Sequence, residues 1–232
     1  MIRTPLVNKV NKQSSIITPQ QILAGQAVYS KLSLRFYDWV VLNISNNYIW
    51  QCPSRHIQTL YQKYVSNNHL EAGPGTGYFL DHCRFIDAPR IALMDLNQNC
   101  LDASAKRLKD YKPELYKRNI FDPIDLAVPH FDSLGINYVL HCLPGDIRTK
   151  SVVFKNLKVL LNPNAVVFGS TILGKGVKLN LPARMITRAY NSKGIFSNLH
   201  DDFEGLKSAL ETNFSSCHVE TIGCVALFWA RL

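Results

Sequence analysis

The sequence predicts an α/β fold, with a mostly parallel β-sheet covered by helices on both faces. Three observations support this prediction. Short apolar segments alternate with helical patterns from residue 66 onward, which is typical of parallel sheets built from β–α units. A glycine-rich turn over residues 71–77 follows the first apolar segment. The chain has 232 residues, 47% of them hydrophobic, which is enough for one large core.

The N-terminal part, residues 1–65, is expected to form an arm and a helical cap. Residues 1–17 are polar and rich in Asn, Ser and Lys, which favours a loose arm. A threonine-proline pair, typical of a helix start, opens a helical pattern over residues 18–46. A second helix is expected over residues 54–65.

The second part, residues 66–232, is expected to form the main domain. The segment 174–200 is long for a loop in a compact domain, which favours a roof over a substrate; a solvated crossover is the alternative. Periodicity and turn residues place the remaining elements. Strands are expected at 69–72, 91–95, 115–120, 133–140 and 165–171, helices at 97–111, 148–161 and 201–214, and two final strands within 217–232.

The formal net charge of +9 is concentrated near the N-terminus. Residues 1–68 hold seven Lys and Arg against a single acid, Asp38, whereas the rest of the chain holds 19 basic and 16 acidic residues. A basic first third is compatible with RNA or an anionic substrate. Since no dense Lys/Arg run with interleaved aromatics occurs, a solvated surface is the simpler interpretation.

Nothing in the sequence indicates a membrane or a secretory route. No apolar run of about 18 residues occurs, and the first residues lack the apolar core of a signal peptide. Six cysteines are scattered through apolar segments without C-x-x-C spacing, which favours reduced, buried thiols and gives no zinc motif. We therefore expect a cytoplasmic protein without a metal site.

The clearest chemical signal is the run from Glu71 to Gly77, which reads E-A-G-P-G-T-G between a predicted strand and a predicted helix. Gly73, Gly75 and Gly77 allow a tight turn and let a ligand lie against bare main chain. Asp95 ends the next strand, where a carboxylate can accept hydrogen bonds from both hydroxyls of a ribose. An ordinary turn with a surface Asp is the alternative.

These residues resemble the E/D-x-G-x-G-x-G motif of class I S-adenosylmethionine-dependent methyltransferases, over about residues 66–232. The resemblance implies a Rossmann-like sheet of seven strands with an antiparallel seventh strand, and S-adenosylmethionine as the cofactor. It places the methionine half of the cofactor on the glycine loop with Glu71, and the ribose on Asp95. An N-terminal stretch resembles the family's tyrosine-bearing helix that covers the cofactor, which adds Tyr29 to the cofactor site and Tyr37 to the substrate site.

Two positions depart from the family pattern. The family has an acid after the third strand, near the adenine amino group, where this chain has Asn119 followed by Ile120. An amide oxygen can still accept that hydrogen bond. The family's Pro-Gly-Gly before the fifth strand is replaced by residues 163–165, where Asn164 tolerates the left-handed conformation of such a turn. The expected cofactor contacts therefore include Asn119 and Ile120, and also Asn137 at the end of the fourth strand.

The methyl acceptor is expected near residues 137–145, which read N-Y-V-L-H-C-L-P-G. The Asn/Asp-Pro-Pro-Tyr motif that holds an exocyclic amine in nucleic-acid methyltransferases is absent, which disfavours that class. His141 is the candidate catalytic base for a hydroxyl acceptor, with an ordinary pKa of about 6.5 and hence a rate that rises through about pH 6–7. A histidine hydrogen-bonded in a loop is the alternative. Tyr138 and Phe196 are the candidate contacts for an apolar or aromatic acceptor.

The sequence therefore predicts an S-adenosylmethionine-dependent enzyme that methylates an oxygen or nitrogen of a small molecule, without a metal and mainly by proximity. Two alternatives stay open: an RNA methyltransferase that uses the basic N-terminal region, and a non-catalytic protein that keeps the cofactor site. A nicotinamide dehydrogenase is disfavoured, because Tyr78 stands where its motif has the last glycine. The sequence does not predict the oligomeric state.

Overall fold

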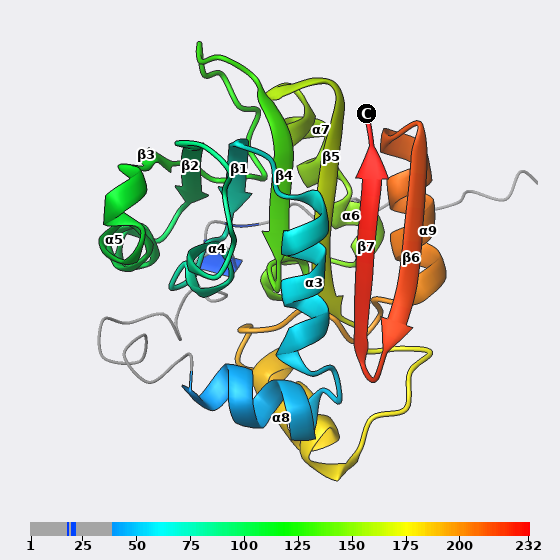
Figure 1. Ribbon diagram of the computed structural model, residues 1–232. Coiled ribbons are helices and arrows are strands. Elements are labelled where there is room, and N and C mark those ends of the chain that lie inside the picture. Colours follow the sequence, from blue (N-terminus) through cyan, green and yellow to red (C-terminus); the bar gives the residue numbers. More distant parts are fainter. Residues whose placement is uncertain (1–17, 19, 22–38) are drawn as a thin grey trace, which may run out of the picture.

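A seven-stranded sheet forms the centre of the computed structural model, which describes residues 18, 20–21 and 39–232. The strand order is β3-β2-β1-β4-β5-β7-β6, and β7 alone runs antiparallel to its neighbours (Figure 1). This arrangement confirms the predicted fold. The strands are β1 Asn68–Ala72, β2 Arg90–Asp95, β3 Glu114–Lys117, β4 Phe131–Asn137, β5 Leu161–Ile172, β6 Ser216–Ile222 and β7 Val225–Arg231.

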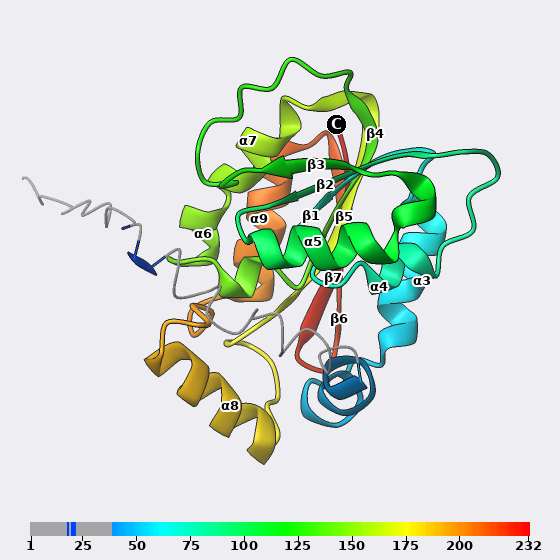
Figure 2. The same ribbon diagram turned by 90° about the vertical axis from the view of Figure 1, so that its left-hand side faces the viewer.

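Helices cover both faces of this sheet, and two more elements lie beyond the carboxyl ends of its parallel strands (Figures 1 and 2). One face carries α3 Ser54–Tyr64, α4 Tyr78–Asp81 and α5 Gln98–Arg107; the other carries α6 Ile147–Lys150, α7 Val152–Lys158 and α9 Phe203–Asn213. The elements beyond the strand ends are a π-helix, η1 Trp39–Ile49, and α8 Leu181–Ser192. Short 3-10 turns, η2 Lys109–Tyr111 and η3 Leu140–Cys142, complete the described part.

Each face of the sheet has its own apolar core, because side chains alternate along every strand. On one face, Leu70 of β1 belongs to a cluster with Leu206 of α9. On the opposite face, Leu93 of β2 belongs to a cluster with Ile57 of α3. Burial on both faces explains why the strands read as nearly continuous apolar runs, and it leaves the strand ends as the place for polar chemistry.

Several predicted elements were wrong at their boundaries. The strand expected over 115–120 ends at Lys117, and the strand expected over 165–171 begins at Leu161. The strand expected over 133–140 ends at Asn137, because Tyr138 has a left-handed backbone with φ of 54° and η3 follows. The helix expected over 148–161 is two helices that meet at Ser151, whose hydroxyl donates to the carbonyl of Arg148 at 2.6 Å and competes with the helical ladder. The turn at Asn164 has the expected left-handed conformation, with φ of 67°, although it lies inside β5.

The N-terminal helical cap is described only in part. Gln20 and Gln21 are helical, and the backbone nitrogen of Gln21 donates to the Thr18 side chain at 3.4 Å, which fits the predicted helix start. Tyr29 and Tyr37 lie outside the described residues, so their predicted roles rest on the sequence alone. The proposed boundary near residue 65 stays a prediction. Among the helices of the described ranges, none has the length and apolar character needed to cross a bilayer.

The segment 174–200 holds the 12-residue helix α8 and is therefore not a plain loop. Asn180 caps the start of α8 by accepting a hydrogen bond from the backbone nitrogen of Ala183 at 2.9 Å. Its amide also donates to the carbonyl of Tyr48 at 2.8 Å, which links α8 to the end of η1. The segment lies at the carboxyl ends of the parallel strands, where a roof over a substrate is expected (Figure 1).

Candidate active site

The glycine loop follows β1 directly and has a left-handed backbone at all three glycines, with φ of 73°, 55° and 76° at Gly73, Gly75 and Gly77. A side chain at Gly73 would come within 2.3 Å of Val139, so this glycine permits a close approach to the loop after β4. A side chain at Gly75 would meet nothing within 4 Å. The loop is therefore packed on one side and open at Gly75, which fits a ligand lying against the main chain.

Glu71 lies beneath this loop, with only 1% of its surface exposed. The Tyr61 hydroxyl donates to its Oε1 at 2.7 Å, and the Nε2 of His69 lies 3.0 Å from its Oε2. The other ring nitrogen of His69 lies 2.8 Å from the hydroxyl of Ser133. Gly135 of β4 leaves the space for the carboxylate, since a Cβ there would approach Oε2 to 2.2 Å. Both carboxylate oxygens thus have internal partners, and the predicted contact between Glu71 and the cofactor stays a prediction.

Sequence reasoning missed the other residues of this network, Tyr61, His69 and Ser133. Tyr61 belongs to α3, ten residues before Glu71, and its ring packs edge-on against Phe168 of β5. Burial, together with the adjacent charge of Glu71, raises the pKa of Tyr61 well above its usual value. The hydroxyl therefore stays protonated and acts as a fixed donor to the carboxylate.

Asp95 ends β2, beside the glycine loop, as the sequence predicts. The carbonyl of Met94 accepts a hydrogen bond from the backbone nitrogen of Gly73 at 2.8 Å, which fixes the two strand ends together. The backbone nitrogen of Asn97 donates to Oδ1 of Asp95 at 2.7 Å. Burial raises the pKa of Asp95 to about 6, despite these backbone hydrogen bonds. Hydrogen bonds donated by ribose hydroxyls to this carboxylate would compensate for its lost hydration.

Asn119 and Ile120 follow β3 in a loop held by its own hydrogen bonds. The side chain of Asn119 accepts from the backbone nitrogen of Phe121 at 3.1 Å and donates to Asp122 at 3.0 Å. Ile120 is buried, and its carbonyl accepts from the amide of Asn156 at 3.0 Å. The oxygen of Asn119 keeps one lone pair for the adenine contact, which stays a prediction.

The end of β4 brings three predicted site residues close together. Asn137 is buried and accepts a hydrogen bond from the hydroxyl of Ser170 at 3.0 Å. The backbone of Tyr138 turns sharply, with its nitrogen donating to the carbonyl of Ser170 at 2.9 Å. His141 follows one turn later, and the rings of Tyr138 and His141 meet edge to face at 5.8 Å. Strands β4 and β5 therefore together fix the position of residues 137–141.

His141 is buried rather than open to a solvent-filled site, with 3% of its surface exposed. Its ring packs edge-on against Phe196 at 4.6 Å, and its Nδ1 lies 3.4 Å from the backbone nitrogen of Ile172. Burial, and then the nearby charge of Lys150, lowers the pKa of His141 to about 3. This pKa lies below the window of pH 6–7 expected from the sequence, because the ring is enclosed by residues distant in sequence. A base with this pKa takes a proton poorly, so the catalytic role of His141 stays a prediction with a weaker basis.

Phe196 lies in an aromatic cluster that joins the segment 174–200, the predicted roof, to His141 and to Trp50. Its ring lies 5.0 Å from Tyr190 of α8 and 6.1 Å from Trp50, which follows η1. Ser197, the next residue, donates through its backbone nitrogen to the carbonyl of His141 at 2.8 Å. The predicted substrate contacts Tyr138 and Phe196 are thus both neighbours of His141.

A buried ion pair fastens this roof, and no sequence motif indicated it. The ammonium of Lys150, at the end of α6, lies 2.5 Å from Oδ2 of Asp201 and donates to the carbonyl of Ser197 at 2.7 Å. Both charged side chains are fully buried. The backbone carbonyl of Asp201 accepts from Gly174 at 3.1 Å, so the pair also fixes the start of the segment after β5. Breaking one partner would leave an uncompensated buried charge.

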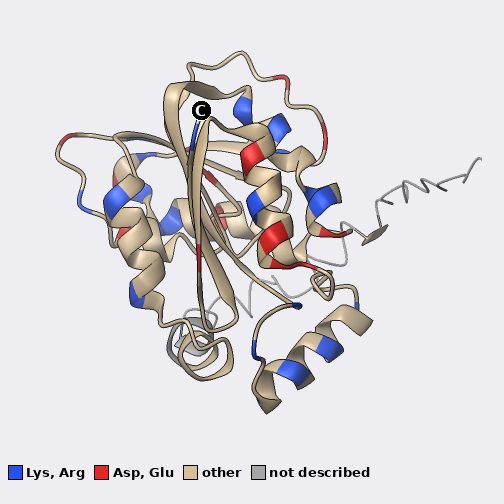
Figure 3. Cartoon of the chain, turned by 90° about the vertical axis from the view of Figure 1, so that its right-hand side faces the viewer, with Lys and Arg blue, Asp and Glu red and all other residues tan. Residues whose placement is uncertain are grey.

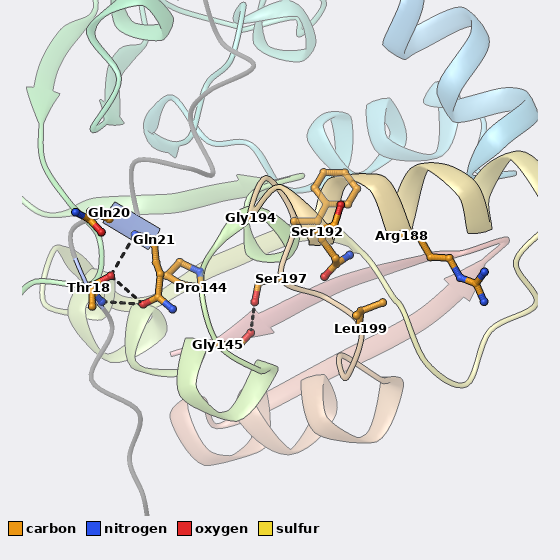
Figure 4. Close-up of a pocket in the computed structure, with 12 residues that line it drawn as sticks. Thr18, Gln20, Gln21, Pro144, Gly145, Arg188, Ser192, Gly194, Ser197 and Leu199 are labelled. Atoms are coloured by element: carbon orange, nitrogen blue, oxygen red, sulfur yellow. Dashed lines mark hydrogen bonds between the residues drawn. The ribbon is translucent and has the colours of Figure 1, made fainter.

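A groove of about 760 Å³ opens beside this cluster (Figure 4). Its walls come from the loop after η3, the last turns of α8, the loop over residues 194–199, and the short described stretch around Thr18 and Gln21. The hydroxyl of Ser197 donates to the carbonyl of Gly145 at 3.0 Å across the floor of the groove. The groove therefore adjoins the corner that holds His141 and Phe196, where an acceptor is expected.

The surface around the groove is basic. The segment 174–200 contains five Lys and Arg residues and no acid. In Figure 3 the ribbon of α8 has blue stretches and no red ones. In the described ranges, no group of three or more His, Cys, Asp or Glu side chains is placed to hold a metal ion.

Comparison with known proteins connects this geometry to one chemistry. A family model described as a methyltransferase domain matches residues 70–167. Demethylluteothin O-methyltransferase of Streptomyces thioluteus is 35% identical over 212 residues, which cover 91% of this chain and 92% of the relative. The physcion biosynthesis cluster O-methyltransferase of Aspergillus chevalieri is 38% identical over 217 residues, covering 92% and 96% of the two chains.

Solved structures share the fold at low sequence identity. The DhpI structure in complex with S-adenosylhomocysteine has a TM-score of 0.64 at 15% identity, and the match covers 93% of this chain and 98% of DhpI. The N-methyltransferase NodS of Bradyrhizobium japonicum, also bound to S-adenosylhomocysteine, has a TM-score of 0.53 at 17% identity, covering 76% and 85%. With the glycine loop, the aspartate after β2 and the extensive identity to the two O-methyltransferases, the chain belongs to the family of S-adenosylmethionine-dependent methyltransferases.

Proposed function

We propose that this methyltransferase methylates a hydroxyl oxygen of a small natural product. The observation that carries the proposal is the groove beside Phe196, which adjoins the strand ends where the cofactor is expected and has the size of a small-molecule site. Two relatives that align with nearly the whole chain are named O-methyltransferases. A third, from Penicillium aethiopicum, is named an N-methyltransferase at 31% identity, so the acceptor atom needs its own test.

The residues of this chain supply position and exclusion of water. S-adenosylmethionine supplies a methyl group that is already activated by the sulfonium. The open side of the glycine loop at Gly75 and the carboxylate of Asp95 would hold the two ends of its methionyl-ribose part. Phe196, Tyr138 and the roof would orient an acceptor and keep water out.

We infer that the acceptor loses its proton without help from His141. The neutral imidazole is a weak base at a pKa of about 3, because the ring is enclosed and lies near the charge of Lys150. Phenols and enols can lose their proton to solvent water before they bind, and the bound oxyanion then takes the methyl group as the S–CH3 bond breaks and S-adenosylhomocysteine leaves. The proposed acceptor is therefore an acidic hydroxyl on an aromatic or conjugated ring.

The test is transfer of labelled methyl from S-adenosylmethionine to a panel of hydroxylated polycyclic and pyrone compounds, with demethylluteothin included. Matched methyl ethers, which lack the free hydroxyl, are the control. We expect label in at least one hydroxyl compound and none in its ether. Label in RNA instead would favour the RNA alternative, and no label with normal binding of S-adenosylhomocysteine would favour the non-catalytic alternative.

A further inference from the structure

The lining of the groove has one charged side chain among the residues that the structure describes, Arg188 of α8. Pro144, Phe196 and Leu199 give the groove apolar walls. Arg188 extends from α8 at one end of the groove, beyond Leu199, while Thr18 and Gln21 lie at the other end (Figure 4). The groove thus has an apolar wall between a cation at one end and uncharged polar residues at the other.

The polar groups near Arg188 are occupied by the protein itself. The amide of Asn191 donates to the carbonyl of Thr187 at 2.7 Å and to Asn198 at 2.9 Å, and its oxygen accepts from the backbone nitrogen of Asn198 at 3.1 Å. The hydroxyl of Ser192 donates to the carbonyl of Ala189 at 2.9 Å. These groups shape the groove, but they already make hydrogen bonds within the protein.

Arg188 itself has no protein anion to pair with in the described ranges. It is exposed on α8, and none of the ion pairs of the described residues includes it. The whole segment 174–200 lacks an acid. The nearest acids in sequence, Asp201 and Asp202, are paired with Lys150 and Lys175. A guanidinium in such surroundings is available to an anion from outside the chain.

We propose that the groove binds an acceptor that carries a carboxylate, with its apolar body against Phe196 and Leu199 and its carboxylate on Arg188. The inference rests on the proposed function and names a class of substrate within it. The planar fork of Arg matches a carboxylate with two parallel hydrogen bonds, so the pair would set the orientation of the acceptor. The uniform positive charge of segment 174–200 would also attract such an acid to the groove.

The experiment measures binding rather than turnover. A panel of one-ring and two-ring hydroxyaryl carboxylic acids is compared with the matching amides, in the presence of S-adenosylhomocysteine, by calorimetry or ligand-observed NMR. We expect at least one acid to bind about 3–10-fold more tightly than its amide at low salt, because a charge-assisted hydrogen bond to a carboxylate is stronger than one to a neutral amide, although exposure limits the gain. The preference should shrink at high salt, since Arg188 is exposed.

Arg188→Gln should remove the preference for the acid and leave the affinity for the amide unchanged. Arg184→Gln is the matched control, because Arg184 is an exposed arginine one helical turn earlier on α8 and does not line the groove. The proposal is overturned if no acid binds better than its amide, or if Arg184→Gln reduces the preference as much as Arg188→Gln. Failure of the proposed function is separate: it would appear as absence of methyl transfer to every compound of both panels.

Discussion

The two halves of the active site are built in different ways. The cofactor half, where we expect the cofactor to bind, lies at the ends of neighbouring strands: the glycine loop after β1, Asp95 after β2 and the loop of Asn119 after β3. Asp95 and Asn119 each accept a hydrogen bond from a backbone nitrogen two residues further along the chain, and the glycine loop is held to the end of the adjacent strand by the bond from Gly73 to the carbonyl of Met94. The acceptor half is assembled from distant parts of the chain, with His141, Phe196 and Trp50 meeting in one cluster.

Because of this difference, we expect substitutions in the two halves to affect different properties of the protein. Changes in the cofactor half should alter ligand affinity with little effect on the fold, because the groups lie at strand ends. Changes in the acceptor half should alter stability first, since its side chains are buried and braced by contacts such as the ion pair of Lys150 and Asp201. The predictions below test that division, in order of decreasing effect.

The largest effect is expected for Asp95→Ala. The variant removes the carboxylate that we expect to accept hydrogen bonds from the ribose hydroxyls, each of which contributes about 1.5–3 kcal/mol when charge-assisted. The affinity for S-adenosylhomocysteine should therefore fall by about 10–1000-fold, measured by calorimetry. Asp102→Ala, an exposed acid on α5, is the control and should bind normally. Equal affinity of Asp95→Ala and wild type would contradict the ribose assignment.

The pH dependence of cofactor binding tests the same assignment of Asp95 to the ribose. Since the pKa of Asp95 is raised to about 6, the carboxylate form is gained as the pH rises through that value. Cofactor affinity should therefore increase between pH 5 and about pH 7, an increase that Asp95→Asn should lack. His141→Gln should keep the increase. An unchanged pH profile in Asp95→Asn would assign the titration to another group.

For His141→Ala, we expect a loss of stability of about 2–4 kcal/mol, in the range of other large buried rings. Turnover per folded molecule should change little, which is the opposite of what a catalytic base predicts. Urea unfolding and methyl transfer are measured on the same preparation. A drop in turnover of about 100-fold or more in a stable variant would restore His141 as the base.

The stability of the protein at acid pH should depend on the same histidine. Its folded pKa of about 3 lies below the ordinary 6.5, so its neutral form contributes stability above pH 6.5 that is lost as the pH falls toward 3. The wild type should lose up to about 1.4 kcal/mol per pH unit over this window through His141 alone. His141→Gln should lose stability less steeply, which thermal melts at pH 7, 6 and 5 would measure.

Tyr61→Phe should have a smaller effect, a loss of about 1–3 kcal/mol in unfolding free energy. The variant keeps the ring in its place against Phe168 but leaves Oε1 of the buried Glu71 without its donor. Tyr48→Phe, an exposed tyrosine, is the control and should be neutral. A neutral Tyr61→Phe would show that the hydroxyl does not support the carboxylate.

The smallest effect is expected for Asn180→Ala, about 1 kcal/mol. The side chain caps α8 and also donates to the carbonyl of Tyr48, so its loss loosens the link between the roof and η1. Because both contacts belong to the acceptor half, affinity for S-adenosylhomocysteine should be unchanged. A loss of cofactor affinity would show that the two halves are coupled.

The division also explains what the sequence could predict. Gly73, Gly75, Gly77 and Asp95 were found because strand ends impose fixed spacings on nearby residues, and the structure places them beside one another. The partners that enclose Glu71 were not found, since Tyr61 reaches it from another element and His69, two residues away on β1, belongs to no recognised motif.

In the acceptor half, the sequence placed His141 near the site but could not give its environment. The low pKa depends on Phe196 and Lys150, which come from other segments of the chain. Lys150 and Asp201 are 51 positions apart, and no motif indicates their pairing. Local sequence patterns therefore located His141 near the site, whereas contacts with residues distant in sequence set its pKa.

The hairpin of β6 and β7 completes both the sheet and the surroundings of Trp50. Strand β7 lies between β5 and β6, and the turn at Gly223 packs so closely on the carbonyl of Trp50 that a Cβ would come within 2.3 Å. The next residue, Cys224, donates to that carbonyl at 2.8 Å and accepts from Leu173 at 2.8 Å. A nascent chain that lacks residues 216–232 therefore has neither the support for Trp50 nor a closed edge on β5. Premature termination in this region would leave an exposed strand edge on β5 and an unformed acceptor site. Such a chain would be degraded or bound by chaperones instead of acting as an enzyme of lower activity.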